Sequence, residues 1–292
     1  MKKVIRMLGL CALIALAFTA CKKNDTNGKV TIKASISQPT SNDRTYITDL
    51  GYMGDKVLRW RGNEVITLFN RTLTGDSGCN IQVTSCNNKY AYFLTSDPYL
   101  EGISTPNRFI AFYPNAAINL DNKVELAIPN QQPYDEYWIA NDIFPMYGFI
   151  AEDYNIEFKS HAGVLMFTAR LNNDTYNTPG TVIPLQKIII TGFDNPSTGD
   201  EDVLYGTMVY DLDGNYTMTN TGNVVEITGG ELKNGNTVTQ FYAILPEGAL
   251  ANGFTAEFIT TDGDSVTYQG GGQAIVAERV TEIRPTLNVS FE

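Results

Sequence analysis

Two serines stand in Gly-Asp-Ser segments that could hold a catalytic nucleophile: Ser77 and Ser265. A serine hydroxyl becomes a strong nucleophile only when a neighbouring base, most often histidine, accepts its proton. The chain contains one histidine, His161, which lies well after Ser77 and well before Ser265. Nothing in this arrangement supplies either hydroxyl with a base, so we interpret both segments as turns.

Each serine segment is similar to a stretch of a known hydrolase family, but the order of the partner residues differs. Residues 74–79 (Thr-Gly-Asp-Ser-Gly-Cys) resemble the nucleophile segment of chymotrypsin-like proteases, whose His and Asp precede the Ser. Residues 263–265 resemble the opening of an esterase family, whose Ser lies near the start of the chain and whose His lies near its end. The sequence has neither order, and it has no nucleophile elbow or phosphate-binding glycine loop.

Acidic clusters and the single histidine offer little for metal or acid–base chemistry. Residues 211–215 begin like a calcium loop, but Gly214 is fourth and Gly222 is twelfth, where an EF-hand needs Gly sixth and Glu twelfth. We interpret residues 200–202 as a solvated acidic loop, and His161 as a hydrogen-bonding group at the start of an apolar strand. We therefore expect no metal, no cofactor and no enzymatic activity. Two distant carboxylates that converge in the fold remain an alternative.

The start of the chain has the layout of an export signal. Three basic residues open it, an apolar run covers residues 7–18, and small residues follow. The run is shorter than the roughly 20 residues that span a bilayer. Cys21 comes directly after, which resembles a bacterial lipobox, although Phe18 stands where Leu is commonest. We predict cleavage after residue 20 and acylation of Cys21. An ordinary signal peptide is the alternative, and Cys11 is a poorer acylation site.

The composition is that of a folded, acidic protein. Hydrophobic residues make up 43% of the 292 residues and charged residues 18%, unlike a disordered chain, a coiled coil or a collagen. The formal charge is −11, from 21 basic and 32 acidic residues, and it becomes −14 when residues 1–20 and their three basic side chains are removed. Nucleic acid is therefore not an expected partner. Residues 21–28 read as a polar tether to the lipid.

Two cysteines remain after Cys11 leaves with the signal and Cys21 takes lipid. Cys79 and Cys86 are close in the sequence, and an exported protein meets an oxidising compartment. We predict a disulfide between them. A metal or redox pair is the alternative, but the spacing differs from Cys-x-x-Cys and no other soft ligand is near.

Short alternating segments separated by Gly, Asn, Asp and Pro predict an all-β fold. Asp-Gly at residues 213–214 and Asp-Gly-Asp at residues 262–264 predict hairpin turns. We expect antiparallel sandwiches, an N-terminal domain over residues 29–152 and a C-terminal domain over residues 153–292. The predicted strands are residues 29–36, 64–69, 90–94, 108–113, 123–128, 156–171, 185–191, 205–210, 224–228, 238–245, 254–260, 265–268 and 282–291.

Several patches recur in a characteristic order between about residues 30 and 290. Together they resemble the fimbrillin family of Gram-negative anaerobes, whose members are lipoprotein precursors of pilus subunits and related surface proteins. One departure is Asn63-Glu64, where the family usually has Asp directly after Gly. The patches are Arg44-Thr45, residues 60–66, residues 109–114 with 128–131, residues 142–146, residues 158–167, and residues 245–258.

The resemblance implies two tandem transthyretin-like β-sandwich domains and a role in pili or adhesion. It further implies a lipid anchor at the outer membrane and cleavage after an arginine, which is Arg44 here, to free the strand over residues 29–36. The gap would accept a strand from another fimbrial subunit. In an anchor or accessory member the lipid stays and no cut is needed, and Arg44 is then an ordinary loop residue. The chain ends directly after a predicted strand, so no long C-terminal donor tail is expected.

A second functional hypothesis is a monomeric surface lipoprotein that binds a glycan or another ligand. Its support is the aromatic residues of 134–138, with Trp138, and of 90–92, since aromatic faces stack on sugars. Packing within the protein is the alternative role for these side chains. A third hypothesis, a hydrolase with two carboxylates, has no local motif in its support.

Overall fold

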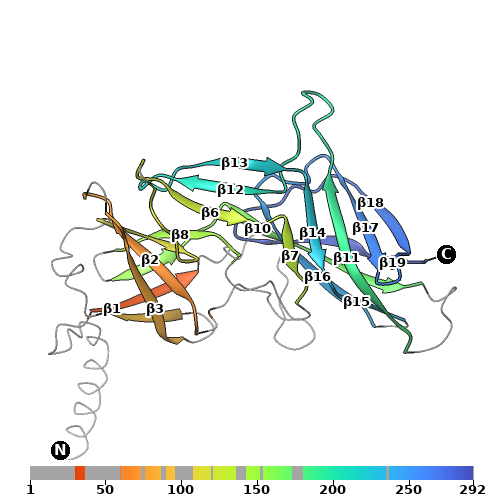
Figure 1. Ribbon diagram of the computed structural model, residues 1–292, viewed down its shortest axis with the longest axis horizontal. Helices are drawn as coiled ribbons and strands as arrows, with labels where there is room; N and C mark the ends of the chain where they lie inside the picture. Colours follow the sequence, from red (N-terminus) through yellow and green to blue (C-terminus); the bar gives the residue numbers. More distant parts are fainter. Residues whose placement is uncertain are drawn as a thin grey trace, which may run out of the picture.

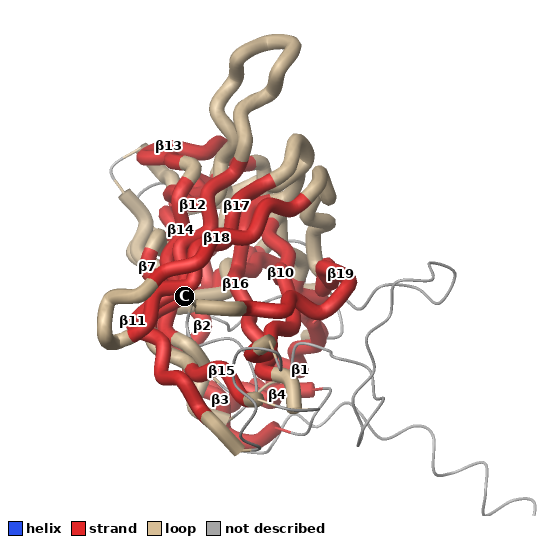
Figure 2. Tube along the Cα trace, turned by 90° about the vertical axis from the view of Figure 1, so that its right-hand side faces the viewer, coloured by secondary structure: helices blue, strands red, loops and turns tan. Residues whose placement is uncertain are grey.

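The computed structural model describes residues 30–36, 60, 62–73, 76–86, 90–95, 108–119, 121–135, 143–151, 154–172, 180–234 and 237–291. Regular structure within these ranges is entirely β, which confirms the predicted class (Figures 1 and 2). None of these residues belongs to a helix that could cross a membrane. The strands are β1 (Val30–Ile36), β2 (Val65–Asn70), β3 (Cys79–Cys86), β4 (Tyr90–Thr95), β5 (Phe109–Tyr113), β6 (Val124–Ile128), β7 (Gln131–Pro133), β8 (Met146–Phe149), β9 (Asn155–Phe158), β10 (Ala162–Leu171), β11 (Val182–Gly192), β12 (Tyr205–Tyr210), β13 (Tyr216–Gly222), β14 (Val224–Thr228), β15 (Glu231–Lys233), β16 (Thr239–Pro246), β17 (Phe254–Thr260), β18 (Ser265–Gly270) and β19 (Val280–Val289).

Alternating burial explains why most of these segments form strands. In β12 and β17 every second side chain is buried, because successive side chains of a strand point to opposite faces of its sheet. All five residues of β5 are buried instead. The reason is that a second layer covers this strand: the ring centroid of Phe112 lies 5.5 Å from that of Tyr210 on β12.

Seven strands form a sheet in the order β8-β5-β2-β3-β4-β1-β9. Its two ends meet, because the backbone N–H of Tyr147 on β8 donates to the carbonyl of Lys159 (2.9 Å), and the N–H of Lys159 donates to the carbonyl of Tyr147 (2.7 Å). The seven strands therefore close into a ring. Buried side chains from all seven strands contribute to one hydrophobic core.

Strands from the two halves of the chain pair with one another. β6 joins β12 and β13 in a three-stranded sheet, and β7 pairs parallel with β14 at the end of the sheet β18-β17-β11-β14-β7. A further three-stranded sheet has the order β16-β10-β19. Figure 1 shows β6, β12 and β13 between the strands at the left and the large sheet at the right.

β10 lies between two hydrophobic cores and contributes side chains to both. Val164 and Met166 belong to the first core, whereas Leu165 and Phe167 belong to the second core, which lies around β11 and β17. Both faces of this strand are thus apolar, which explains its unbroken run of buried residues from Ala162. The first core also takes in residues such as Tyr210, so it draws on both sides of residue 152.

Both predicted hairpin turns are confirmed. Gly214, between β12 and β13, has a φ of 84°, and Gly263, between β17 and β18, has a φ of 97°. These values lie in the left-handed region that glycine adopts without a steric penalty. The predicted strand over residues 156–171 is divided at residues 159–161, where Ser160 Oγ donates a hydrogen bond to the carbonyl of Pro145 (2.6 Å).

The predicted disulfide between Cys79 and Cys86 is not formed. The two residues are the first and last of β3. Seven steps along an extended chain separate their Cα atoms by about 23 Å, whereas a disulfide requires less than about 7 Å. The Cys86 thiol lies 3.7 Å from the carbonyl oxygen of Trp60 instead.

Candidate functional site

β1 lies inside its sheet although it is the first described strand of the chain. It pairs antiparallel with β4 from Val30 to Ser35 and parallel with β9 from Lys33 to Ile36. No described element precedes it, so its withdrawal would not require any described element to be threaded through the fold. We call the place between β4 and β9 the β1 seat.

The two faces of β1 differ in chemistry. Ile32 and Ala34 are completely buried, and Ile36 is nearly so. On the other face the ammonium of Lys33 lies 3.9 Å from the centroid of the Tyr90 ring, a cation–π contact. One face of β1 is thus part of the core, and the other meets solvent and polar groups.

Aromatic side chains form the floor of the β1 seat. The indole of Trp60 makes edge contacts with Phe93 of β4 at 5.9 Å and with Phe158 of β9 at 5.5 Å between ring centroids. Tyr113 of β5 lies 5.8 Å from the same indole. Trp60 is only 5% exposed, and its Nε1 has no hydrogen-bond partner among the described residues. The seat is therefore deep and apolar.

An empty seat would be chemically specific for an extended strand. Without β1, backbone N–H and C=O groups of β4 and β9 would lose their partners, and the aromatic floor would meet water. Unpaired backbone groups and exposed apolar surface are both unfavourable, and a single strand with alternating apolar residues satisfies both at once. The arrangement supports strand binding rather than bond-breaking chemistry.

The predicted lipidation site Cys21 and the predicted cleavage site Arg44 lie outside the described residues and stay predictions. Arg44 follows Ile36, the last residue of β1, by eight positions in the sequence. A cut at this place would therefore separate β1 from the rest of the chain.

Ser77 lies in a connection before β3, and Ser265 directly follows the turn at Gly263, whereas residues 74 and 75 lie outside the described residues. The Asp76 carboxylate accepts hydrogen bonds from the backbone N–H of Asn70 (2.6 Å) and of Gly78 (3.2 Å), and so shapes the connection that carries Ser77. Ser265 is an exposed first residue of β18. Within the described ranges, no group of three or more His, Cys, Asp or Glu side chains could hold a metal ion.

His161 is stacked between two tyrosines at the start of β10. Its ring centroid lies 4.2 Å from that of Tyr216 and 5.3 Å from that of Tyr147. Burial lowers the pKa of His161 below its ordinary value of 6.5, although the carboxylates of Glu247 and Glu278 act in the opposite direction. The histidine is thus an uncharged packing residue at neutral pH.

Acidification is expected to destabilise the protein through His161. Because its pKa is lower in the folded state, the unfolded chain takes up the proton first as the pH falls through 6.5, and the folded state loses stability. The loss is at most about 1.4 kcal/mol per pH unit. We expect the unfolding free energy in urea to be lower at pH 5.5 than at pH 7.5, with a weaker dependence in His161→Phe. An equal dependence in both proteins would contradict this assignment.

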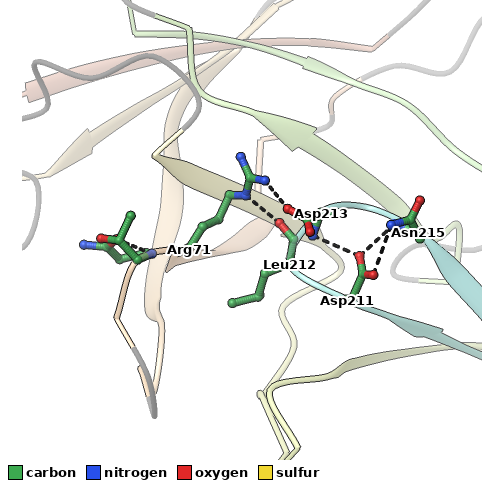
Figure 3. Close-up of polar contacts among 7 residues, drawn as sticks. Arg71, Asp211, Leu212, Asp213 and Asn215 are labelled. Carbon is green, nitrogen blue, oxygen red and sulfur yellow. Dashed lines mark hydrogen bonds and ion pairs between the residues drawn. The ribbon is translucent and has the colours of Figure 1, made fainter.

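Arg71 holds the β12–β13 turn against the first half of the chain (Figure 3). Its Nε donates to the carbonyl of Leu212 (2.7 Å), and its Nη2 pairs with the Asp213 carboxylate. The guanidinium carbon lies 5.0 Å from the centroid of Phe149. The turn also rests on Tyr147, since a Cβ added at Gly214 would come within 2.7 Å of that ring. A side chain at position 214 would therefore clash with Tyr147 in this docked position.

Arg71→Ala is expected to lower the unfolding free energy by about 1–2 kcal/mol, because a charged hydrogen bond to a backbone carbonyl is lost. The ion pair contributes little, since Asp213 is largely exposed. The unfolding free energy of Arg71→Lys should lie between those of the unsubstituted protein and Arg71→Ala, because lysine keeps the charge but lacks the planar guanidinium group. Urea unfolding of Arg71→Ala, Arg71→Lys and Asp213→Asn measures these free energies. If Asp213→Asn lost as much stability as Arg71→Ala, the hydrogen bond to the Leu212 carbonyl would not be the main contribution of Arg71.

Gln132 was not singled out by the sequence, yet it closes a sheet edge. Its Oε1 accepts a hydrogen bond from the N–H of Ile244 (2.7 Å), and its Nε2 donates to the carbonyl of the same residue (2.8 Å). Ile244 lies on β16, the first strand in the order β16-β10-β19. The side-chain amide thus replaces a neighbouring peptide group. Gln132 is the middle residue of the short strand β7, and no local pattern in the sequence indicated its partner.

The aromatic residues considered for sugar binding have other contacts. The Tyr134 ring lies 5.3 Å from the centroid of Phe241 and packs against the second core. Tyr90 faces Lys33, and Trp138 lies outside the described residues. Packing is thus the observed role of Tyr134.

Neither a protein-family model nor a curated protein matches the sequence. Among solved structures, a "putative cell adhesion protein" from Bacteroides ovatus is 11% identical, with 90% of this chain and 95% of that chain covered and a TM-score of 0.50. The chain has the fold of this adhesion protein. The fimbrillin resemblance is therefore confirmed at the level of the fold.

Two further solved structures match similar lengths of the chain. A "putative cell adhesion protein" from Bacteroides uniformis is 16% identical, covers 89% of this chain and 94% of its own, and has a TM-score of 0.49. A fimbrial protein from Bacteroides vulgatus is 8% identical, covers 89% and 91%, and has a TM-score of 0.35. These descriptions are of adhesion and fimbrial proteins, not of enzymes.

Proposed function

We propose that the protein is a fimbrillin-like surface lipoprotein, a pilus subunit or pilus-associated adhesin, that assembles by strand exchange at the β1 seat. Lipid on Cys21 holds it at the outer membrane. A cut after Arg44 then lets β1 leave, and a strand of another fimbrial subunit enters between β4 and β9. The division at residue 152 into two transthyretin-like domains stays part of this proposal.

The position of β1 is the observation that supports the proposal most directly. A strand with hydrogen-bonded neighbours on both sides leaves two unpaired edges when it departs. An incoming strand restores both ladders and covers the positions of Ile32 and Ala34 in the core. The first described strand of the chain is also the one whose withdrawal disturbs the connectivity least. Catalysis plays no part in such a function.

Treatment of the protein with an Arg-specific protease tests the proposal. We expect release of an N-terminal fragment that contains β1, followed by assemblies larger than the monomer in size-exclusion chromatography. Mass analysis of the new N-terminus should place the cut after Arg44. The matched control is Arg44→Gln, which should stay intact and monomeric.

Two results would contradict the proposal. One is loss of the same fragment from Arg44→Gln, because the cut would then lie elsewhere. The other is a cleaved protein that keeps its fragment and stays monomeric at high concentration. Separately, a mature N-terminus without acylated Cys21 in the native membrane would remove the anchor from the proposal.

A further inference from the structure

Two phenylalanines mark opposite corners of the β1 seat. Phe93 of β4 is the antiparallel partner of Ile32, and Phe158 of β9 is the parallel partner of Ile36. The indole of Trp60 contacts both rings. It therefore spans the diagonal between these corners, and the residue at the middle of that diagonal is Ala34.

The residues around the middle of the seat fit this placement. Ala34 pairs with Ala91 of β4 and with Ile156 of β9, and all three side chains are completely buried although the two alanines carry a single methyl group each. A row of methyl groups is shielded from water only when a larger side chain covers it. Trp60 is 5% exposed, and its contacts with Phe93 and Phe158 on either side make it the side chain that we assign to this cover.

We propose that Trp60 is a size gate for the β1 seat. Its indole restricts the central position of any strand bound there to a small side chain, whereas the positions of Ile32 and Ile36 accept large apolar ones. The inference rests on the proposed strand exchange for its partner, which is a second polypeptide with the pattern large-x-small-x-large. That segment runs antiparallel to β4 and parallel to β9, and its intervening residues are polar, as Lys33 and Ser35 are in β1.

Substitutions in the intact chain test the gate without any strand exchange. Ala34→Leu is expected to lower the melting temperature by roughly 3–10 °C, because overpacking strains the core. In the background of Trp60→Leu the same change should cost less than half as much, since the indole no longer occupies the space. Trp60→Phe serves as a second background if Trp60→Leu does not fold. Additive effects in both backgrounds would overturn the gate.

Labelled peptides with the sequence of residues 30–36 test the partner. We expect the native peptide to bind the Arg-protease-treated protein, measured by fluorescence anisotropy, and the Ala34→Leu peptide to bind at least about tenfold more weakly. A Thr31→Leu peptide, altered at an exposed position of the outer face, should bind like the native one. The Trp60→Leu protein should reduce the tenfold difference to about threefold or less.

The outcomes separate the gate from the strand exchange. Equal binding of the native and Ala34→Leu peptides would overturn the gate and leave strand exchange intact. Binding of no peptide, the native one included, would overturn the strand-exchange function and with it the partner, while the melting temperatures of the intact variants would still decide whether Trp60 limits position 34.

Discussion

Ile32→Asp is expected to release β1 from its sheet or to unfold the protein, with a loss of about 4 kcal/mol or more in unfolding free energy. Ile32 is completely buried and lies opposite Phe93. The substitution removes the apolar contact and places a carboxyl group where no solvent reaches it. Because folded proteins are stable by only about 5–15 kcal/mol, such a loss dominates the balance.

The measurement for Ile32→Asp is urea unfolding combined with tryptophan emission. The chain has two tryptophans, so Trp138→Phe in the background leaves Trp60 as the reporter. Release of β1 would expose the indole and shift its emission to longer wavelength. The matched control is Thr31→Asp, since Thr31 is the exposed neighbour on the opposite face. If both substitutions cost the same, β1 does not hold Ile32 in the core.

Gln132→Leu is expected to cost about 2–5 kcal/mol, although leucine is apolar and similar in size. The change leaves both the N–H and the carbonyl of Ile244 buried without a partner, and each such group costs about 1–3 kcal/mol. Gln132→Glu should also destabilise, because a carboxylate accepts from the N–H but repels the carbonyl oxygen. Gln131→Leu is the matched control, since Gln131 is exposed on the other face of β7.

Chemical denaturation of the glutamine variants gives the decisive comparison. We expect Gln132→Leu to lose several-fold more stability than Gln131→Leu. Similar stability of the two would show that water or another group replaces the amide at Ile244. Deuterium exchange adds a local readout, since the Ile244 amide should lose protection first in Gln132→Leu.

The edge of β16 and the β1 seat differ in how their backbone groups are paired. At β16 a side-chain amide pairs with the backbone groups of Ile244, so these two groups are not open to another chain. At the β1 seat the ladder is completed by the first described strand, whose exchange we propose. A protein whose proposed function depends on edge pairing needs both, because an unprotected second edge would allow unspecific association.

Sequence alone determined the local features of this protein. Alternation of apolar residues predicted β12, β14 and β17 with their observed bounds, and Asp-Gly predicted the turns at Gly214 and Gly263. These signals depend on neighbours within a few residues, which any extended strand or tight turn imposes directly. The sequence also showed that its one histidine is far along the chain from either Gly-Asp-Ser segment.

Only the tertiary structure decided which strands meet. The pattern of β1 does not reveal that β4 and β9 flank it, nor that β6 and β7 pair with strands from the second half. The spacing of Cys79 and Cys86 suggested a bridge, but β3 extends between them. The role of Gln132 was invisible because Ile244 lies 112 residues away. Pairing and register arise from side-chain packing between distant segments, and a local pattern carries no information about its partner.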